Sequence, residues 1–86
     1  METALGVWLP QVTIVRCRRL ADAQLAVEAV RVRHCVVLQL EGAEPAEAQR
    51  IVDFLSGATR ALDGSMDRID EATFLCAPLG VSVQQG

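Results

Sequence analysis

Residues 48–62 carry the feature that most limits what this chain can fold into. Six apolar residues recur there at steps of mostly three and four, which places them on one stripe of a helix: Ala48, Ile51, Val52, Leu55, Ala58 and Leu62. A second apolar patch of Phe54, Gly57 and Ala61 lies beside this stripe. A surface helix usually has a single apolar stripe, so we expect this helix to be covered on more than one side.

Gly57 supports the same expectation. A glycine inside a helix costs about 1 kcal/mol relative to alanine, so we expect another backbone to approach closely at this position. The close approach is either tight packing within one subunit or a contact between subunits.

The rest of the chain alternates strand and helix patterns. Residues 1–10 read as a short lead-in, and residues 11–86 as one domain. In order, the patterns predict a strand over 11–18, a helix over 20–33, a strand over 35–40, a helix over 45–62, a hairpin of 65–69 and 72–77, and a last strand over 81–84. A strand–helix–strand unit needs a crossover, so the first two strands are expected to be parallel. The fold class is therefore α/β, a two-layer sandwich with two helices on one face of a mixed sheet of about five strands.

Turn residues separate these elements. Pro45 is placed to open the second long helix, and Asp63-Gly64 to end it, with Gly64 in a left-handed conformation. Asp70-Glu71 is expected to form the hairpin turn, and Pro78 to end the strand before it.

The apolar content predicts a second copy. The chain has 86 residues, of which 51% are hydrophobic and only 3% aromatic. A chain this short buries only about 60–65% of the surface that its unfolded form exposes. If both helices cover one face of the sheet, the other face carries Val37 and the row of either Phe74 or Leu75. We expect this face to be closed by another subunit in a homodimer.

Composition argues against several classes of protein. The net charge is -3, and all basic residues are arginine, which disfavours a nucleic-acid binder. Cys17, Cys35 and Cys76 have no zinc spacing and read as reduced thiols. The chain lacks an apolar run of about 18 residues and a signal-peptide pattern, so a cytoplasmic location is expected.

Catalysis has little support in the sequence. His34, at the boundary of a helix and a strand, has no cysteine or serine partner nearby and reads as a partly exposed boundary residue. The carboxylates in and beside the hairpin turn (Asp67, Asp70 and Glu71) are expected to be solvated. No glycine-rich loop follows a strand, so neither an enzyme nor a cofactor or metal site is expected. Five arginines at element ends are either solvated or contact an acidic partner: Arg16, Arg18, Arg19, Arg31 and Arg33.

The helix-to-hairpin region resembles one protein family. The matching segments are QRIVDFLSGAT at 49–59, ALDGS at 61–65, RI at 68–69 and FLCAP at 74–78, with DAQ at 22–24 and VVLQL at 36–40. Together they resemble the core domain of SepF, a bacterial cell-division protein that binds the tail of FtsZ. The resemblance covers about residues 11–84. It implies two helices against a sheet, with two subunits paired through their sheets.

The resemblance also implies two sites. Phe74 and Arg68, six residues apart on the two arms of the hairpin, look like parts of the pocket for the FtsZ tail. The alternative is that Phe74 is ordinary core. Gly57, with Phe54 and Ala61, matches the surface through which SepF dimers associate into polymers. Arg60 stands where the family usually has an aromatic residue, which would make a contact there polar.

The start of the chain departs from the family pattern. SepF proteins usually begin with an amphipathic membrane anchor and a linker. Residues 1–10 are too short for this role and contain no basic residue, so membrane contact is not supported by this segment.

Taken together, the sequence predicts a non-enzymatic cell-division adaptor. It would bind the C-terminal tail of FtsZ and help assemble or align FtsZ filaments at the septum. The alternative is a small ligand-binding regulatory α/β domain that uses the open sheet face as a metabolite pocket. An RNA-binding module is a weaker third option.

Overall fold

The helices and strands of the computed structural model, which describes residues 9–86, follow the apolar patterns of the sequence. The elements in chain order are β1 (Val12–Arg16), the short 3-10 helix η1 (Leu20–Asp22), α1 (Ala23–Arg31), β2 (Cys35–Gln39), α2 (Pro45–Ala61), β3 (Ser65–Arg68) and β4 (Thr73–Ala77). Most of the expected lead-in over residues 1–10 lies outside the described residues. Leu9 and Pro10, which are described, have no regular structure.

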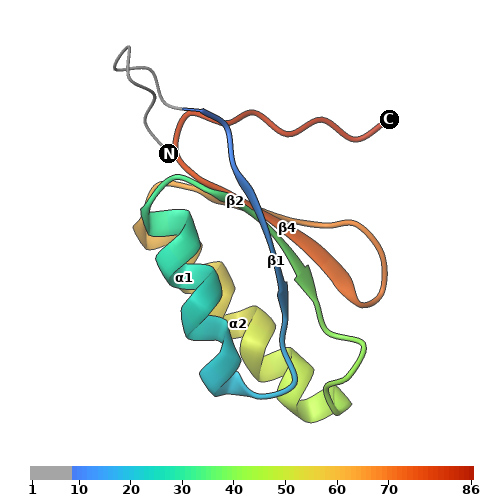
Figure 1. Ribbon diagram of the computed structural model, residues 1–86. Helices are drawn as coiled ribbons and strands as arrows, with labels where there is room; N and C mark the ends of the chain where they lie inside the picture. Colours follow the sequence, from blue (N-terminus) through green and yellow to red (C-terminus); the bar gives the residue numbers. More distant parts are fainter. Residues whose placement is uncertain (1–8) are drawn as a thin grey trace.

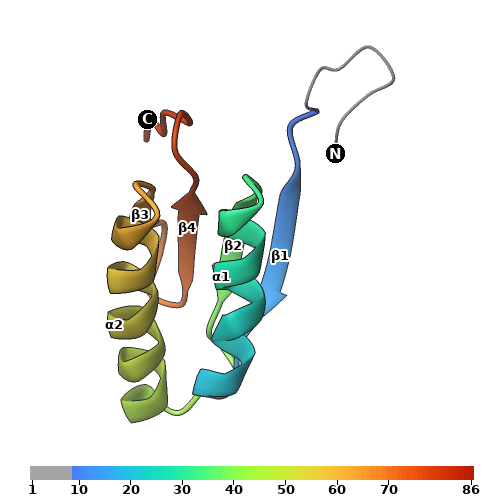
Figure 2. The same cartoon turned by 90° about the vertical axis from the view of Figure 1, so that its left-hand side faces the viewer.

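The described strands form a four-stranded mixed sheet in the order β1-β2-β4-β3. β1 and β2 are parallel, as the crossover through α1 requires, and β4 is antiparallel to both β2 and β3. Both helices cover the same face of this sheet (Figures 1 and 2). The two-layer α/β class is therefore confirmed.

Strand register decides which side chains meet the helices. Val15, Leu38, Phe74 and Arg68 are register partners in one row across the sheet, and this row lies on the helix face. The neighbouring row of Ile14, Val37, Leu75 and Asp67 lies on the opposite face, which neither of the described helices covers. The sequence did not decide whether the row of Phe74 or the row of Leu75 lies on the face opposite the helices. The register shows that it is the row of Leu75, and we call this face the open face.

The core lies between the sheet and the two helices. Its most enclosed members are aliphatic residues and small alanines that let the helices approach the strands: Ala23, Ala26, Val36, Leu38, Ile51, Leu55 and Cys76. Burial of each large aliphatic side chain contributes about 1.5–3 kcal/mol. The helices are thus held to the sheet by small buried alanines of α1 and by Ile51 and Leu55 from the predicted stripe of α2.

The first helix begins differently from the prediction over 20–33. It opens with one turn of 3-10 helix, and the regular α-helix ends at Arg31, so Arg33 lies beyond its last turn with a φ of 69°. The carboxylate of Asp22 accepts hydrogen bonds from the backbone N–H groups of Arg18 (3.0 Å) and Arg19 (3.1 Å). These bonds lower the pKa of Asp22 and hold the chain where it leaves β1.

The end of α2 corrects one expectation about glycine. Asp63, not Gly64, takes the left-handed conformation, with a φ of 60°. An aspartate tolerates this region better than most residues do. Gly64 is instead required for space, because a Cβ there would overlap the carbonyl oxygen of Ala77 and lie 3.0 Å from Cγ2 of Thr59.

Gly57 has no such neighbour within the described chain. A Cβ built on it would meet nothing within 4 Å, and the residue is exposed. Tight packing inside the subunit is therefore the wrong explanation for this glycine.

The last strand expected over 81–84 does not form, although the fold class stands. Pro78 has no N–H to donate, Val81 N–H bonds back to the Pro78 carbonyl at 3.2 Å, and Gly80 turns the chain with a φ of 88°. This turn directs residues 81–86 away from the edge of the sheet, and they have no regular structure (Figure 1).

Candidate functional site

The strongest candidate site is a groove beside the hairpin. It lies between the first half of α2, the loop at residues 40–44 and the turn end of β3 and β4, with a volume of about 560 Å³. Its apolar lining consists of Leu40, Ala43, Pro45, Ala48, Val52, Ala72 and Phe74, and its polar lining of Glu41, Gln49, Arg68 and Glu71. We call it the hairpin groove. An apolar wall with a few polar groups is the composition of a ligand or peptide site.

Phe74 and Arg68, predicted as a pair, are brought together in this groove. They are direct register partners on β4 and β3, and the guanidinium carbon of Arg68 lies 5.5 Å from the centre of the Phe74 ring. This is the geometry of a cation–π interaction. The strands thus place a large apolar ring and a positive charge next to each other at the groove wall.

The hairpin turn fixes the position of Arg68. Its Nε donates to the carbonyl of Asp70 (3.1 Å), and its Nη2 donates to the carbonyl of Glu71 (3.0 Å). The Asp70 carboxylate in turn accepts the N–H of Ala72 (3.0 Å), and this hydrogen bond is the main cause of the lowered pKa of Asp70. Two carbonyls hold the guanidinium without neutralising its charge, so it can still attract an anionic group.

Phe74 has two environments. It is only 9% exposed and belongs to the hydrophobic core, as the alternative interpretation predicted. It also lines the hairpin groove. The ring therefore supports the fold on one side and forms part of the groove on the other.

The apolar groove residues on α2 were not singled out as a site from the sequence. Pro45 was predicted only to begin the helix, and Ala48 and Val52 to form part of its apolar stripe. The start of α2 extends beyond the strands it covers, which leaves this end of the stripe facing the groove.

The open face of the sheet is a second candidate surface. Val12 is 65% exposed and Ile14 57% exposed, beside the half-buried Val37 and Leu75. Val37, predicted at a dimer interface, is thus on the face opposite α1 and α2. Neighbouring apolar side chains on an uncovered face are typical of an interaction surface.

The outer surface of α2 carries the third predicted patch. Gly57 and Ala61 are exposed, and Phe54, on the same side of the helix, is 46% exposed. Phe54 also borders a shallow cavity of about 470 Å³ between the helices, where it lies with Leu20 and Val27. The patch is therefore flat at Gly57 and Ala61 and hollowed beside Phe54.

The titratable residues considered for catalysis make ordinary structural contacts. His34 is half-buried, and its Nδ1 lies 2.9 Å from Oγ1 of Thr13. Among the described residues, Cys17 and Cys76 are buried free thiols; burial raises the pKa of Cys17 to about 11 and also raises that of Cys76. A protonated, enclosed thiol is a poor nucleophile.

The described helices include none that is long and apolar enough to cross a membrane. The fold and its surfaces define a small two-layer α/β domain with a groove beside the hairpin and two exposed apolar surfaces.

Comparison with known proteins identifies the family. Residues 12–83 match the family model described as Cell division protein SepF, and the chain therefore belongs to the SepF family of cell-division proteins. It is 42% identical over 73 residues to Cell division protein SepF of Prochlorococcus marinus (strain MIT 9211), covering 85% of this chain and 38% of the relative. It is 41% identical over 73 residues to the SepF of Synechococcus sp. (strain CC9605), covering 85% of this chain and 39% of the relative. The chain thus spans about two fifths of the length of these relatives.

Solved structures share the fold. A SepF-like protein from Pyrococcus furiosus superposes with a TM-score of 0.82 at 12% identity, covering 91% of this chain and 98% of that chain. A SepF-like protein from Archaeoglobus fulgidus gives a TM-score of 0.80 at 13% identity, covering 87% and 93%. The resemblance drawn from the helix-to-hairpin region is therefore confirmed.

Proposed function

We propose that this domain is a non-enzymatic adaptor that binds the C-terminal tail of FtsZ in the hairpin groove. Through this contact it would help to assemble or align FtsZ filaments in the cytoplasm at the division septum. The observation that carries the proposal is the pairing of Phe74 and Arg68 at the wall of a peptide-sized groove in a SepF-family domain.

The groove suits a short peptide with mixed character. An apolar side chain of the tail would lie against Phe74, Ala48 and Val52, while a carboxylate would approach Arg68. A disordered tail loses conformational freedom when it binds, so the affinity of a single groove should be modest.

A homodimer compensates for modest affinity at each site. We infer that two copies pair through the open sheet face, with Ile14, Val37 and Leu75 at the centre of the contact. Each dimer would then carry two grooves on one rigid body. On a polymer with many tails, the second binding event gains from a high effective concentration.

Higher assembly would use the outer surface of α2. The open space at Gly57 supports this part of the proposal, because the missing side chain leaves room for a neighbouring dimer. Phe54 and Ala61 would extend the contact on either side.

The test is calorimetric titration with a peptide of the FtsZ C-terminal tail from the same organism. Phe74→Ala removes core contacts and would cost about 3–5 kcal/mol of stability. A loss of binding in this variant could therefore come from unfolding, so other groove variants are needed. Phe74→Leu, Arg68→Glu and Ala48→Gln each alter the groove, the last by placing a longer side chain on its α2 wall. Ala46→Gln, an exposed position on the same helix outside the groove lining, is the matched control.

We expect saturable binding that Arg68→Glu and Ala48→Gln weaken at least five-fold and Ala46→Gln leaves unchanged. Circular dichroism would confirm that each variant is folded. A folded, unaltered protein that shows no binding would contradict the proposal. In that case, thermal stabilisation by a metabolite would favour the alternative of a ligand-binding regulatory domain.

A further inference from the structure

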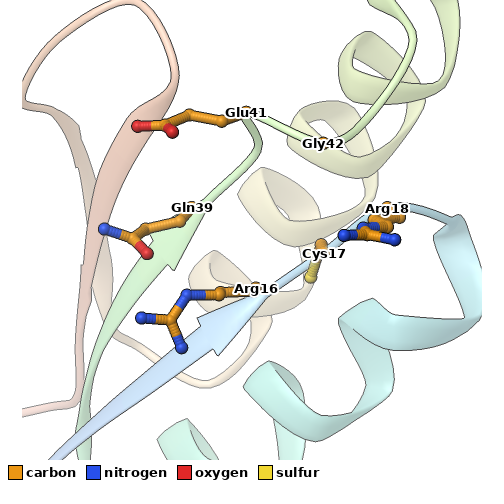
Figure 3. A pocket seen from close by; sticks show the side chains of 6 residues that line it. All are labelled: Arg16, Cys17, Arg18, Gln39, Glu41 and Gly42. Atoms are coloured by element: carbon orange, nitrogen blue, oxygen red, sulfur yellow. The ribbon is translucent and has the colours of Figure 1, made fainter.

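A second, polar cavity lies across the 40–44 loop from the hairpin groove. Its volume is about 350 Å³, and it is lined by Arg16, Cys17, Arg18, Gln39, Glu41 and Gly42 (Figure 3). We call it the arginine cavity. It lies at the carboxyl ends of the parallel strands β1 and β2, where α/β sheets commonly bind ligands.

The arginine cavity contains positive charge that the described chain does not neutralise. Arg16 and Arg18 are both exposed, and neither forms an ion pair with another residue in 9–86. Figure 3 shows Arg16 and Gln39 extending to the same side, away from the helices, as expected for register partners on the open face. A guanidinium and an amide side by side can both donate hydrogen bonds to one carboxylate.

Gly42 makes room for the second arginine. A Cβ at this position would lie 2.9 Å from Nε of Arg18 and 3.1 Å from its Cγ. The side chain of Arg18 therefore lies against the 40–44 loop at Gly42, and a larger residue there would make this side chain shift. The loop thus positions Arg18 as well as separating the two cavities.

Glu41 connects the arginine cavity to the hairpin groove. It lines both cavities, so a peptide that leaves the groove past Glu41 enters the arginine cavity. Its own negative charge opposes an acidic ligand near the entrance. An acidic side chain would be favoured only where it passes Glu41 and reaches the arginines.

We propose that the arginine cavity binds an acidic side chain of the same peptide whose apolar residues occupy the hairpin groove. This inference rests on the proposed function, and it adds the requirement that the FtsZ tail carry a second carboxylate besides the one that approaches Arg68. The arginines would then select tails by charge, while Phe74 and its neighbours select them by shape.

The experiment compares two tail peptides. One has the natural FtsZ C-terminal sequence, and in the other every Asp and Glu is replaced by Asn and Gln. Each is titrated into the unaltered protein and into Arg16→Gln, Arg18→Gln and Glu41→Gln. Arg33→Gln removes an exposed charge beyond the other end of the parallel strands and is the matched control.

For the natural peptide, each arginine change should weaken binding by about two- to five-fold, which is the range of an exposed ion pair. Glu41→Gln should strengthen it, and Arg33→Gln should leave it unchanged. All differences should shrink at high salt and disappear with the neutral peptide. Gly42→Ala should weaken binding less than Arg18→Gln does, because the flexible side chain of Arg18 shifts but keeps its charge.

Two results would overturn this inference while leaving the proposed function intact. One is loss of natural-peptide binding only in Ala48→Gln and Arg68→Glu, with Arg16→Gln and Arg18→Gln binding as tightly as the unaltered protein. The other is saturable binding of inorganic phosphate that depends on Arg16 and Arg18, together with unchanged peptide binding in Arg16→Gln and Arg18→Gln, which would assign the arginine cavity to a free anion. If neither peptide binds the folded, unaltered protein, both proposals fail.

Discussion

Two glycines near the end of α2 show how differently one residue type can be used. Gly64 is enclosed, because a Cβ there would overlap the carbonyl oxygen of Ala77 in β4. Gly57 is exposed, and no atom of residues 9–86 outside its own helix turn lies within 4 Å of its Cβ position. The first glycine is needed by the fold, and the second is free for a contact outside the subunit.

Replacing each glycine by alanine should have opposite effects. Gly64→Ala should destabilise the domain by about 1–3 kcal/mol, because the backbone must move to admit the methyl group. Gly57→Ala should stabilise it by up to about 1 kcal/mol, because alanine is a better helix former. Urea unfolding measures both values, and equal effects of the two changes would contradict this assignment of their roles.

Cys17 should make the stability of the domain sensitive to alkaline pH. Burial raises its pKa from the ordinary 9.0 to about 11, with the carboxylate of Asp22 as a smaller cause. The unfolded chain therefore loses this proton at lower pH than the folded chain, and the free energy of unfolding should fall as pH rises from about 9 to 11.

Urea unfolding at a series of alkaline pH values, with a reducing agent present, measures this decrease in the free energy of unfolding. Cys17→Ala should show a shallower decline over the same pH range, although its stability at neutral pH will be lower. The raised pKa of Cys76 contributes a smaller remaining slope. The same slope in both proteins would show that Cys17 is not the source.

At the scale of elements, a single carboxylate joins the two helical segments. Oε2 of Glu47, in the first turn of α2, accepts the backbone N–H of Leu20 at the start of η1 (2.9 Å). Its other oxygen lies 3.3 Å from Nη1 of Arg50. This contact ties the first turn of α2 to the start of η1, 27 positions earlier in the chain.

Glu47→Ala should cost about 1.5–3 kcal/mol, the range for a hydrogen bond to a charged group whose partner is left unpaired. Glu44→Ala, at the exposed position before α2 begins, has no such bond and should change stability by less than about 0.5 kcal/mol. Thermal or urea unfolding of the two variants distinguishes these values. A loss in Glu44→Ala as large as in Glu47→Ala would indicate a general effect of charge near the start of the helix.

At the scale of the whole molecule, the two layers leave one face of the sheet without a cover. An apolar face on a domain this small is expected to bury itself in an oligomer. Ile14→Glu introduces a charge at an exposed position of this face and should convert a dimer to a monomer without unfolding the domain. Val37→Glu should do the same at the predicted centre of the interface.

Light scattering at micromolar concentration measures the change in mass. The control is Val32→Glu, which should remain a dimer. Val32 is about as exposed as Ile14, but it follows α1 and lies away from the open face. A monomer in the unaltered protein would contradict the pairing of sheets.

Assembly beyond the dimer should depend on the other side of the molecule. Gly57→Lys places a long charged side chain on the outer surface of α2, where there is free space in the subunit. We expect it to leave the dimer intact and to prevent larger assemblies in sedimentation or electron microscopy, whereas Ala46→Lys in the first turn of the same helix has no effect. An unchanged size distribution in Gly57→Lys would rule out this surface.

The sequence alone determined the elements and their order, because apolar spacing is a local property with a fixed period in helices and strands. The stripe from Ala48 to Leu62 and the strands around Val36 and Leu38 were sufficient for the two-layer fold, and the helix-to-hairpin segment was sufficient for the family. Phe74 and Arg68 could also be paired from the sequence, since the two arms of a hairpin must lie side by side.

Only the tertiary structure decided which face each row of side chains occupies. Whether Phe74 or Leu75 points toward the helices depends on strand register, and a shift of one residue would reverse the answer. The space at Gly57, the enclosure of Gly64 and the turn that directs residues 81–86 off the sheet depend on segments distant in the sequence. The hairpin groove and the arginine cavity likewise arise where separate elements meet, so local patterns could name some of their residues but could not bring them together.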